Sequence, residues 1–179
     1  MTVTQTAPDA VQSALEQPKV ESHLHPRGSF AVSDHPVPTG REEVWRFTPL
    51  SRLRGLHADA EFGTGGIVYE WNTPDRARVE QVSGEAAREL RGISGLVPNT
   101  RFAARVLAEA PSTLLVDVPA EAEVAEPVMV RIDGSAVEAT LNTEALHVAL
   151  RFGRHSRATV VLNHTGSAAA APGVEIEVG

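Results

Sequence analysis

The chain contains no cysteine among its 179 residues. This absence excludes disulfide bonds, thiolate metal sites and a cysteine nucleophile, and it fits a reducing compartment. The first residues carry neither a basic cluster nor an apolar stretch, so no signal peptide is predicted, and no apolar run approaches the length needed to span a membrane. We therefore expect a cytoplasmic protein that does not bind to a membrane.

Aromatic side chains are also scarce, at 4% of the chain, and Phe152 is the only one after Ser112. Because sugar-binding faces usually present aromatic rings, this composition gives little support to a carbohydrate-active enzyme. Acidic residues outnumber basic ones, and the formal net charge is −7. A negatively charged chain is a poor partner for nucleic acid, so no nucleic-acid binding is expected.

After Ser112 the sequence contains a series of short apolar runs rich in Val, Leu and Ile. Proline, glycine, aspartate and serine lie between the runs, a pattern typical of strands joined by turns. No amphipathic helix long enough to cover a parallel sheet separates them. The strands must therefore bury one another, either as a sandwich or as a stacked coil. The runs occupy residues 113–118, 128–132, 145–152, 158–163 and 174–178.

Before Pro111 the sequence predicts a different organisation. Residues 1–38 hold five prolines and are predicted to form a flexible arm, with a short helix at 9–16. Two runs at 67–71 and 77–82 are separated by turn residues and predict a β-hairpin. The predicted boundary with the strand-rich part lies at Pro111.

Capping patterns predict the helices of this region. Thr39 and Glu42 have the spacing of a capping box for a helix that continues to Phe47, and Thr48 with Pro49 would start a second one. The second helix would cover residues 50–54, and the two together would bury Val44, Phe47, Leu50 and Leu53.

Two further helices are predicted before Pro111. Ser83 is expected to cap one at 85–91, and Asn99 or Thr100 to cap one that ends at Ala110. The buried face of the latter would contain Phe102, Val106, Leu107 and Ala110. The expected fold class is therefore α+β and mostly β, with an arm at 1–38, a helical domain with a hairpin at 39–111 and a β body at 112–179.

Several groups in the first half could carry chemistry, but each has a simpler interpretation. His23, His25 and His35 could suggest a metal site, which would need further ligands, so we interpret them as solvated loop histidines. Residues 63–66 lack the lysine and the following helix of a phosphate-binding loop, so they are interpreted as a plain glycine loop. Trp45 is interpreted as an anchor on the core rather than a ligand-stacking residue.

The β body offers candidate groups for hydrolysis. None of its hydroxyls lies in a Gly-x-Ser-x-Gly context, and residues 163–167 predict a strand that ends in a turn. No catalytic, cofactor-binding or metal-binding residue is therefore predicted, although a carbohydrate-active β-helix enzyme and a generic protein-interaction module stay open as alternatives. The groups considered are His147, His155, His164, Asp117, Asp133, Ser156, Thr165 and Ser167.

Three stretches resemble one known family. Residues 36–50, PVPTGREEVWRFTPL, resemble the entry motif of the SufB/SufD family, in which a proline precedes Arg-Glu-x-x-Trp-Arg-aromatic-Thr. The segments 115–119 and 126–130 are similar to the first β-coil strands of that family, and residues 158–167 are similar to a later rung. The resemblance extends from about Phe30 to the end of the chain, in the order that the family shows.

This resemblance implies a small helical domain followed by the first rungs of a right-handed parallel β-helix. It also implies a non-catalytic scaffold subunit of a SufBCD-type iron–sulfur cluster assembly complex, which pairs with a SufB-like subunit and works with a SufC-like ATPase. The absence of cysteine favours SufD. The remaining rungs and the SufC-binding domain are expected beyond Gly179, so the cluster would be assembled by the full complex and no cofactor is expected in this part.

Overall fold

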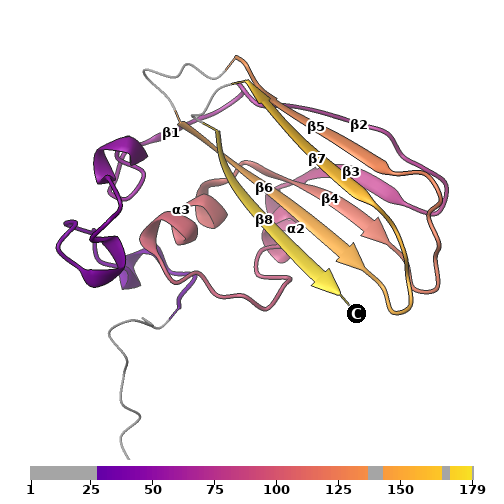
Figure 1. Ribbon diagram of the computed structural model, residues 1–179, viewed down its shortest axis with the longest axis horizontal. Helices are drawn as coiled ribbons and strands as arrows, with labels where there is room; N and C mark the ends of the chain where they lie inside the picture. The colour runs from indigo at the N-terminus through magenta and orange to yellow at the C-terminus, as the bar shows by residue number, and fades with distance from the viewer. Residues whose placement is uncertain (1–27, 137–142, 167–169, 179) are drawn as a thin grey trace, which may run out of the picture.

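The computed structural model describes residues 28–136, 143–166 and 170–178. These residues form strands, two α-helices and three short 3-10 helices (Figure 1). None of the described helices is long and apolar enough to cross a membrane. The strands are β1 (Phe62–Gly63), β2 (Val68–Trp71), β3 (Arg78–Ser83), β4 (Ser112–Val118), β5 (Val128–Gly134), β6 (Thr143–Phe152), β7 (Val160–Gly166) and β8 (Ala170–Val178). The helices are α2 (Gly84–Glu89) and α3 (Arg101–Glu109), with η1 (Val32–Asp34), η2 (Glu43–Trp45) and η3 (Leu50–Leu53) as the 3-10 helices.

The strands from β4 onward alternate between two sheets. In sheet A, β4, β6 and β8 pair in parallel, and β1 and β3 complete the sheet. In sheet B, β5 and β7 pair in parallel, and β2 completes the sheet. β6, β7 and β8 therefore each lie parallel to the strand two places earlier in the chain (Figure 1).

The five strands predicted after Ser112 are confirmed as β4 to β8. β7 continues to Gly166, so most of the predicted turn at 163–167 is strand. Ser167 and the helix predicted at 9–16 lie outside the described residues.

The predicted hairpin between residues 67–71 and 77–82 is wrong. β2 pairs antiparallel with β5 in sheet B, whereas β3 pairs antiparallel with β4 in sheet A. The loop between them therefore crosses from one sheet to the other. The crossing lets Tyr69 and Val79 reach the same core from opposite sides, which two neighbouring strands of one sheet would not do.

The main hydrophobic core lies between the two sheets. Along β5, Val128, Val130 and Ile132 are at most 1% exposed, and the residues between them point the other way. This alternation is the period of two that a strand with one buried face shows. Sheet A supplies the opposite wall of the core through Val79, Leu114, Val116, Leu146, Val148 and Leu150.

Sheet A is covered on its second face as well. Residues 143–150 of β6 are all buried, and those that alternate with the core positions are small or polar, such as Ala145 and His147. Ala145 packs with Val106 and Ala110 at the end of α3. On the neighbouring strand, the Thr113 hydroxyl donates to the carbonyl oxygen of Ala87 in α2 at 3.4 Å. The two helices therefore shield this face from water.

The helix predicted to end at Ala110 is confirmed as α3. The Thr100 hydroxyl accepts a hydrogen bond from the Ala103 amide at 3.2 Å, which satisfies one of the unpaired amides at the helix start. Val106 and Ala110 are buried as predicted, while Phe102 and Leu107 are half-buried. The helix predicted at 85–91 is α2, but the side chain of Ser83 makes no capping hydrogen bond.

The capping box predicted at Thr39 is only partly confirmed. The Glu42 carboxylate reaches back to the Thr39 amide at 3.0 Å and also accepts from the Gly40 amide at 2.9 Å. The Thr39 hydroxyl, however, donates to that same carboxylate at 2.9 Å instead of capping the Glu42 amide. The helix that follows is the single turn η2, which begins at Glu43.

The buried face predicted for the first two helices is wrong at its most apolar position. Phe47 is 87% exposed and Val44 is 49% exposed, although Leu53 does pack in the cluster around Leu56. η2 and η3 are single 3-10 turns, too short to present the repeating face of an α-helix. The predicted Thr48 cap is also wrong, because Pro49 is the residue that precedes η3.

Candidate interaction surface

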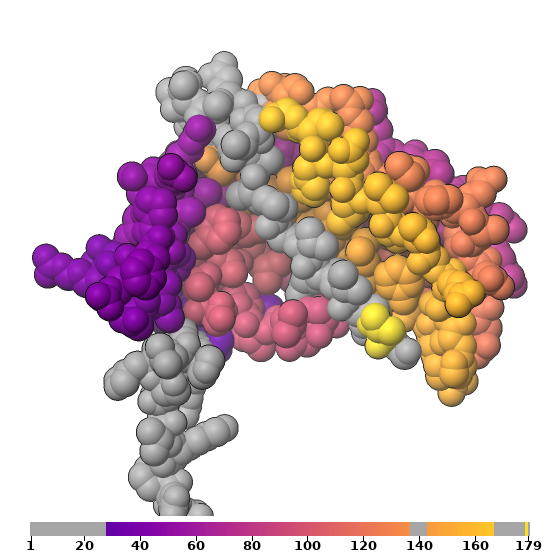
Figure 2. Space-filling model, viewed as in Figure 1, coloured from indigo at the N-terminus to yellow at the C-terminus, as the bar shows by residue number. Residues whose placement is uncertain are grey.

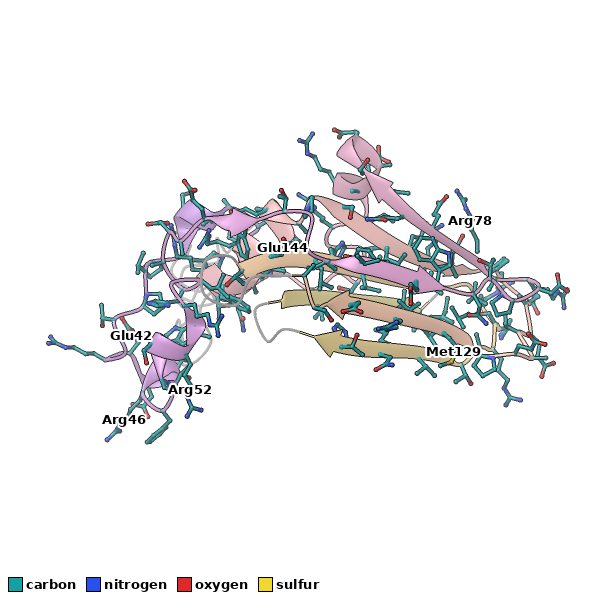
Figure 3. All side chains as sticks on the ribbon, turned by 90° about the horizontal axis from the view of Figure 1, so that it is seen from above. Glu42, Arg46, Arg52, Arg78, Met129 and Glu144 are labelled. Carbon is teal, nitrogen blue, oxygen red and sulfur yellow. The ribbon has the colours of Figure 1, made fainter. Side chains whose placement is uncertain are left out.

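Sheet B has one face in contact with solvent. Met129 and Arg131 of β5 point away from the core, and both are exposed. The register places Glu70 of β2 and Asn163 of β7 beside Arg131, and Val161 beside Met129. Figure 3 labels Met129 at the end of the molecule opposite Glu42 and Arg46. We call this surface the open face; it contains Val68, Glu70, Met129, Arg131, Asp133, Val161 and Asn163.

Arg131 lies between two carboxylates on the open face. Its guanidinium lies 3.0 Å from the Glu70 carboxylate and 2.7 Å from the Asp133 carboxylate. Hydrogen bonds from the side chain and the amide of Ser135 lower the pKa of Asp133, and the charge of Arg131 lowers it further. The charge of Arg131 is thereby matched within the sheet, so this residue is not an unpaired anion-binding group.

A shallow hollow of about 340 Å³ lies at one end of the open face. Asn72 lines it, but its side chain is already used: the amide group donates to the Pro127 carbonyl at 3.1 Å, and the side-chain oxygen accepts from the Met129 amide at 2.6 Å. Apolar area from Trp71 and Met129 therefore dominates what a partner would contact. The hollow is lined by Glu70, Trp71, Asn72, Met129, Val130, Arg131 and Asn163.

The composition of the open face suits contact with another protein. Trp, Met and Arg are the residue types enriched in the centres of protein–protein interfaces. The polar groups of Arg131, Asp133 and Asn72 are satisfied within the chain, so a partner that covered them would leave few of them unpaired. The arrangement offers an apolar surface with fixed polar groups between its apolar residues.

The candidate groups for hydrolysis are not brought together. His147 is buried in sheet A, where its Nδ1 lies 2.8 Å from the Thr113 hydroxyl. Asp117 is four residues further along β4 from Thr113, roughly 13 Å away by the rise of a strand. The Arg151 guanidinium donates to Asp117 at 2.8 Å, and this bond lowers the pKa of that carboxyl. A carboxylate held in this way is poorly suited to act as a general acid at neutral pH.

The other candidates lie apart from His147. His155 and His164 are exposed, in the loop after β6 and on β7 respectively. The Ser156 hydroxyl has no hydrogen-bond partner among the described residues, so no base there activates it as a nucleophile. Within the same residues, no three His, Asp or Glu side chains gather in a group that could hold a metal ion.

The residues of the first half also have structural surroundings. His23 and His25 lie outside the described residues. His35 is 5% exposed and its Nε2 lies 2.8 Å from the Ser29 carbonyl oxygen, so the prediction of a solvated loop histidine is wrong for this residue. Trp45 is half-buried, so only part of its ring is shielded from solvent.

The glycine loop at 63–66 contacts an internal carboxylate. The Gly66 amide donates to both oxygens of Glu144, at 2.8 and 2.9 Å, and Glu144 is 6% exposed. The amide that a phosphate would use is therefore already paired with a side chain of β6. Burial, together with the nearby charge of Glu144, raises the pKa of Tyr69 to about 12.

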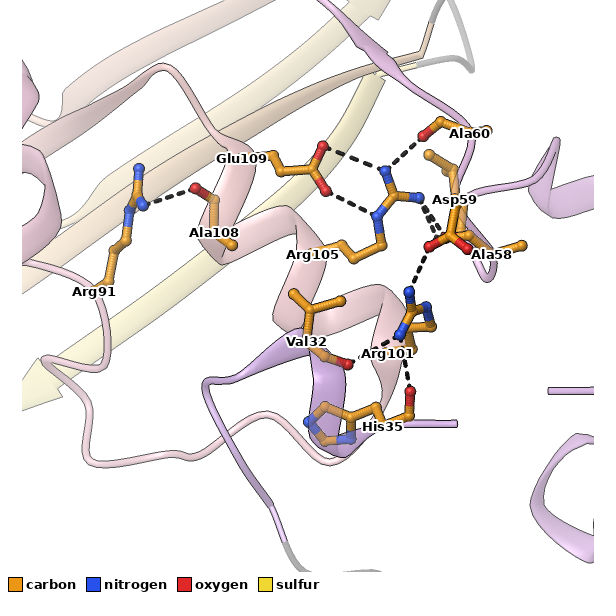
Figure 4. Close-up of polar contacts among 11 residues, drawn as sticks. Val32, His35, Ala58, Asp59, Ala60, Arg91, Arg101, Arg105, Ala108 and Glu109 are labelled. Carbon is orange, nitrogen blue, oxygen red and sulfur yellow. Dashed lines mark hydrogen bonds and ion pairs between the residues drawn. The ribbon is translucent and has the colours of Figure 1, made fainter. Parts of the chain in front are cut away.

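Sequence reasoning missed two arginines of α3 (Figure 4). Arg105 is 4% exposed and donates to the Ala58 carbonyl at 2.7 Å and to Glu109 at 2.8 Å. Arg101 donates to the carbonyls of Val32 and His35, both at 3.0 Å, and also to Asp59. The four-residue spacing of two arginines on a helix that is otherwise largely apolar was the available signal. Through these hydrogen bonds the two arginines attach both the loop before β1 and the η1 segment to helix α3.

Comparison with known proteins gives the family. No family model matches the chain, and no solved structure matches it significantly. An iron–sulfur cluster assembly SufBD family protein of Mycobacterium bovis is 34% identical over 163 residues, which cover 89% of this chain and 40% of the relative. Proteins of the same family name are 34% identical in Mycobacterium tuberculosis, with the same coverage, and in Mycobacterium leprae over 84% of this chain and 37% of the relative.

The chain thus spans about two fifths of the length of the curated relatives it matches. With 34% identity across 89% of its length, the chain belongs to the iron–sulfur cluster assembly SufBD family.

Proposed function

We propose that this chain is part of a cytoplasmic scaffold subunit for iron–sulfur cluster assembly, without catalytic chemistry of its own. The observation that carries the proposal is the 34% identity to relatives whose names state iron–sulfur cluster assembly. A SufD-like role is supported by the absence of cysteine, because the usual protein ligands of such clusters are cysteine thiolates. The cluster would be the cargo of the complete complex rather than a resident group of this chain.

The strand arrangement supports a β-helical scaffold. Strands that alternate between two sheets and pair in parallel with the strand two places earlier have the connectivity expected for the first rungs of a right-handed parallel β-helix. In such a stack each rung is a template for the next. The antiparallel strands β2 and β3 would cover the starting edge of each sheet.

The open face supplies a surface for pairing with a SufB-like subunit. Its exposed apolar residues are Val68, Met129 and Val161, and Trp71 lines the hollow at its end. In an interface these would lose contact with water, at about 25 cal/mol for each Å² of apolar surface buried. We propose that the SufC-like ATPase acts with this pair in the same complex.

Co-expression of the full-length protein with the SufB-like and SufC-like subunits of its own organism tests the proposal. Purification through a tag on this protein is expected to retain both subunits. Met129→Asp should reduce retention of the SufB-like subunit by about tenfold, because a charge would be buried in the interface. His155→Gln, an exposed change at a residue that is not part of the open face, serves as the matched control and should leave retention unchanged. A full-length protein that purifies alone from cells containing both subunits would overturn the proposal.

A further inference from the structure

A second exposed surface lies at the opposite end of the molecule from Met129. The N-terminal part of the described chain forms a lobe beside the sheets in the space-filling view (Figure 2), and Figure 3 shows Arg46 and Arg52 projecting from this end. Phe47, at 87% exposed, lies beside the guanidinium of Arg46. We call this the arginine–phenylalanine surface, defined by Arg41, Val44, Arg46, Phe47 and Arg52.

Of the three arginines on this surface, one has an acidic partner among the described residues. Among the described residues, neither Arg41 nor Arg52 forms an ion pair. Arg46 lies 3.7 Å from Glu43, a weak exposed contact, and its guanidinium is 5.5 Å from the centre of the Phe47 ring. Residues 39–54 contain four arginines and two glutamates, whereas the whole chain has a net charge of −7.

Glu42, the other glutamate of this segment, is hydrogen-bonded to the turn at Thr39 and Gly40. Its carboxylate accepts hydrogen bonds from the amides of Thr39 and Gly40 and from the Thr39 hydroxyl. These bonds hold the pKa of Glu42 at about 2, so it stays charged without serving as a partner for Arg41 or Arg52. Four arginines against two glutamates give residues 39–54 a net charge of +2, on a chain whose net charge is −7.

Backbone hydrogen bonds fix the position of Phe47. The Trp45 amide donates to the Glu42 carbonyl, and the Thr48 amide donates to the Trp45 carbonyl, both at 2.9 Å. The Arg52 amide donates to the Pro49 carbonyl at 2.9 Å. These turns hold the segment on either side of Phe47 in place, so a partner that contacted the ring would not need to order this backbone.

We propose that the arginine–phenylalanine surface docks an acidic segment of another protein that carries an apolar side chain for Phe47. Arginine and aromatic residues are the types that dominate binding energy in interfaces, and the planar guanidinium suits paired contacts with carboxylates. A protein segment is favoured over nucleic acid or an anionic membrane because the net charge of −7 repels large polyanions. The proposal depends neither on the open face nor on a role in cluster assembly.

Fluorescence anisotropy with defined peptides tests this proposal on the 179-residue chain. The probes are peptides of about 12 residues rich in Asp and Glu, each with one central Leu, Phe or Trp, and matched peptides in which Asn and Gln replace the acids. We expect at least one acidic peptide to bind about tenfold more tightly than its amide match, and to lose affinity between about 50 and 300 mM salt.

Variants locate the binding on the surface. Arg41→Gln with Arg52→Gln should weaken acidic-peptide binding by about tenfold, and Phe47→Ala should weaken it severalfold. Arg154→Gln with Arg157→Gln removes the same charge from two other exposed arginines, and should change binding by less than about twofold. Circular dichroism confirms that each variant is folded.

Three results would overturn the proposal. Acidic and amide peptides could bind equally, or the Arg154 and Arg157 variant could lose as much affinity as the Arg41 and Arg52 variant. Duplex DNA or phosphatidylserine vesicles could bind more tightly than every peptide in a manner that depends on Arg41 and Arg52, in which case the ligand is not a protein segment. None of these results affects retention of the SufB-like subunit through Met129, so the two proposals fail separately.

Discussion

In sheet A, residues 143–150 of the central strand are buried without interruption, whereas in sheet B the exposed Met129 and Arg131 alternate with buried valine and isoleucine. Both sheets share the core between them, so the difference lies in their outer faces. α2 and α3 cover the outer face of sheet A, and no described element packs as a layer on that of sheet B. Sheet A is thus buried on both faces, whereas sheet B keeps one face in contact with solvent, and that is the face we propose for recognition.

The largest expected effect is on the core wall that sheet A provides. Leu146→Ala removes a fully buried side chain and should lower the free energy of unfolding by about 2–5 kcal/mol, through lost burial and the cavity that remains. Met129→Ala on the open face should change it by less than about 0.5 kcal/mol. Chemical denaturation of both variants measures the difference, and equal losses would remove the contrast between the sheets.

Arg105→Ala tests whether the cover of sheet A depends on a buried charge. The variant leaves the carbonyls of Leu56, Ala58 and Ala60 without their donor and should cost about 3 kcal/mol. Arg88→Ala in α2 is the matched control, because Arg88 makes only an exposed ion pair with Glu85, and should cost less than about 0.5 kcal/mol. A similar small loss for Arg105→Ala would show that the α3 arginines do not hold the loop.

Tyr69 reports on the interior side of sheet B. It is the only tyrosine, so the absorbance of tyrosinate follows it directly. Its pKa is raised to about 12 by burial, so folding is favoured fully below pH 10 and loses on the order of 2 kcal/mol as pH rises from 10 to about 12.

The titration midpoint of the folded protein should therefore lie near 12, and that of the urea-unfolded protein near 10. Glu144→Gln should bring the folded midpoint down modestly, because burial remains while the nearby charge is lost. A folded midpoint near 10 would show that Tyr69 is not packed against the core.

The smallest expected effect concerns the exposed turn at Thr39. The pKa of Glu42 is lowered from 4.5 to about 2, so its hydrogen bonds stabilise the folded chain above pH 4.5 and are lost as pH falls toward 2. Melting temperatures of the wild type and Glu42→Gln should differ slightly at neutral pH and converge near pH 2. A constant difference across this range would mean that the carboxylate charge contributes nothing.

Local patterns could be predicted from the sequence, and pairings could not. The five β-body strands and the Thr100 cap of α3 are set by neighbouring residues, so their signals are complete within a few positions. The partner of a strand is not encoded locally, which is why residues 67–71 and 77–82 were predicted to pair with each other although they belong to different sheets.

The surfaces divide in a similar way. The alternation of apolar and charged residues from Val130 to Asp133 is the local signal of an exposed face. The exposure of Phe47 could not be predicted, because a helical period was assumed where the chain forms a single 3-10 turn. The burial of Arg105 depends on three carbonyls about 45 residues away in the chain, and no local signal specifies such contacts.

Thiol labelling in this cysteine-free chain most directly tests whether sheet B is the face that a partner covers. Met129→Cys should react with a maleimide at nearly the rate of an unfolded peptide, and Ala149→Cys, at a fully buried position of β6, about 100-fold more slowly. When the full-length Met129→Cys protein is assembled with the SufB-like subunit, its labelling rate should fall by about tenfold. An unchanged rate at Met129→Cys in the assembled complex would contradict the role given to the open face.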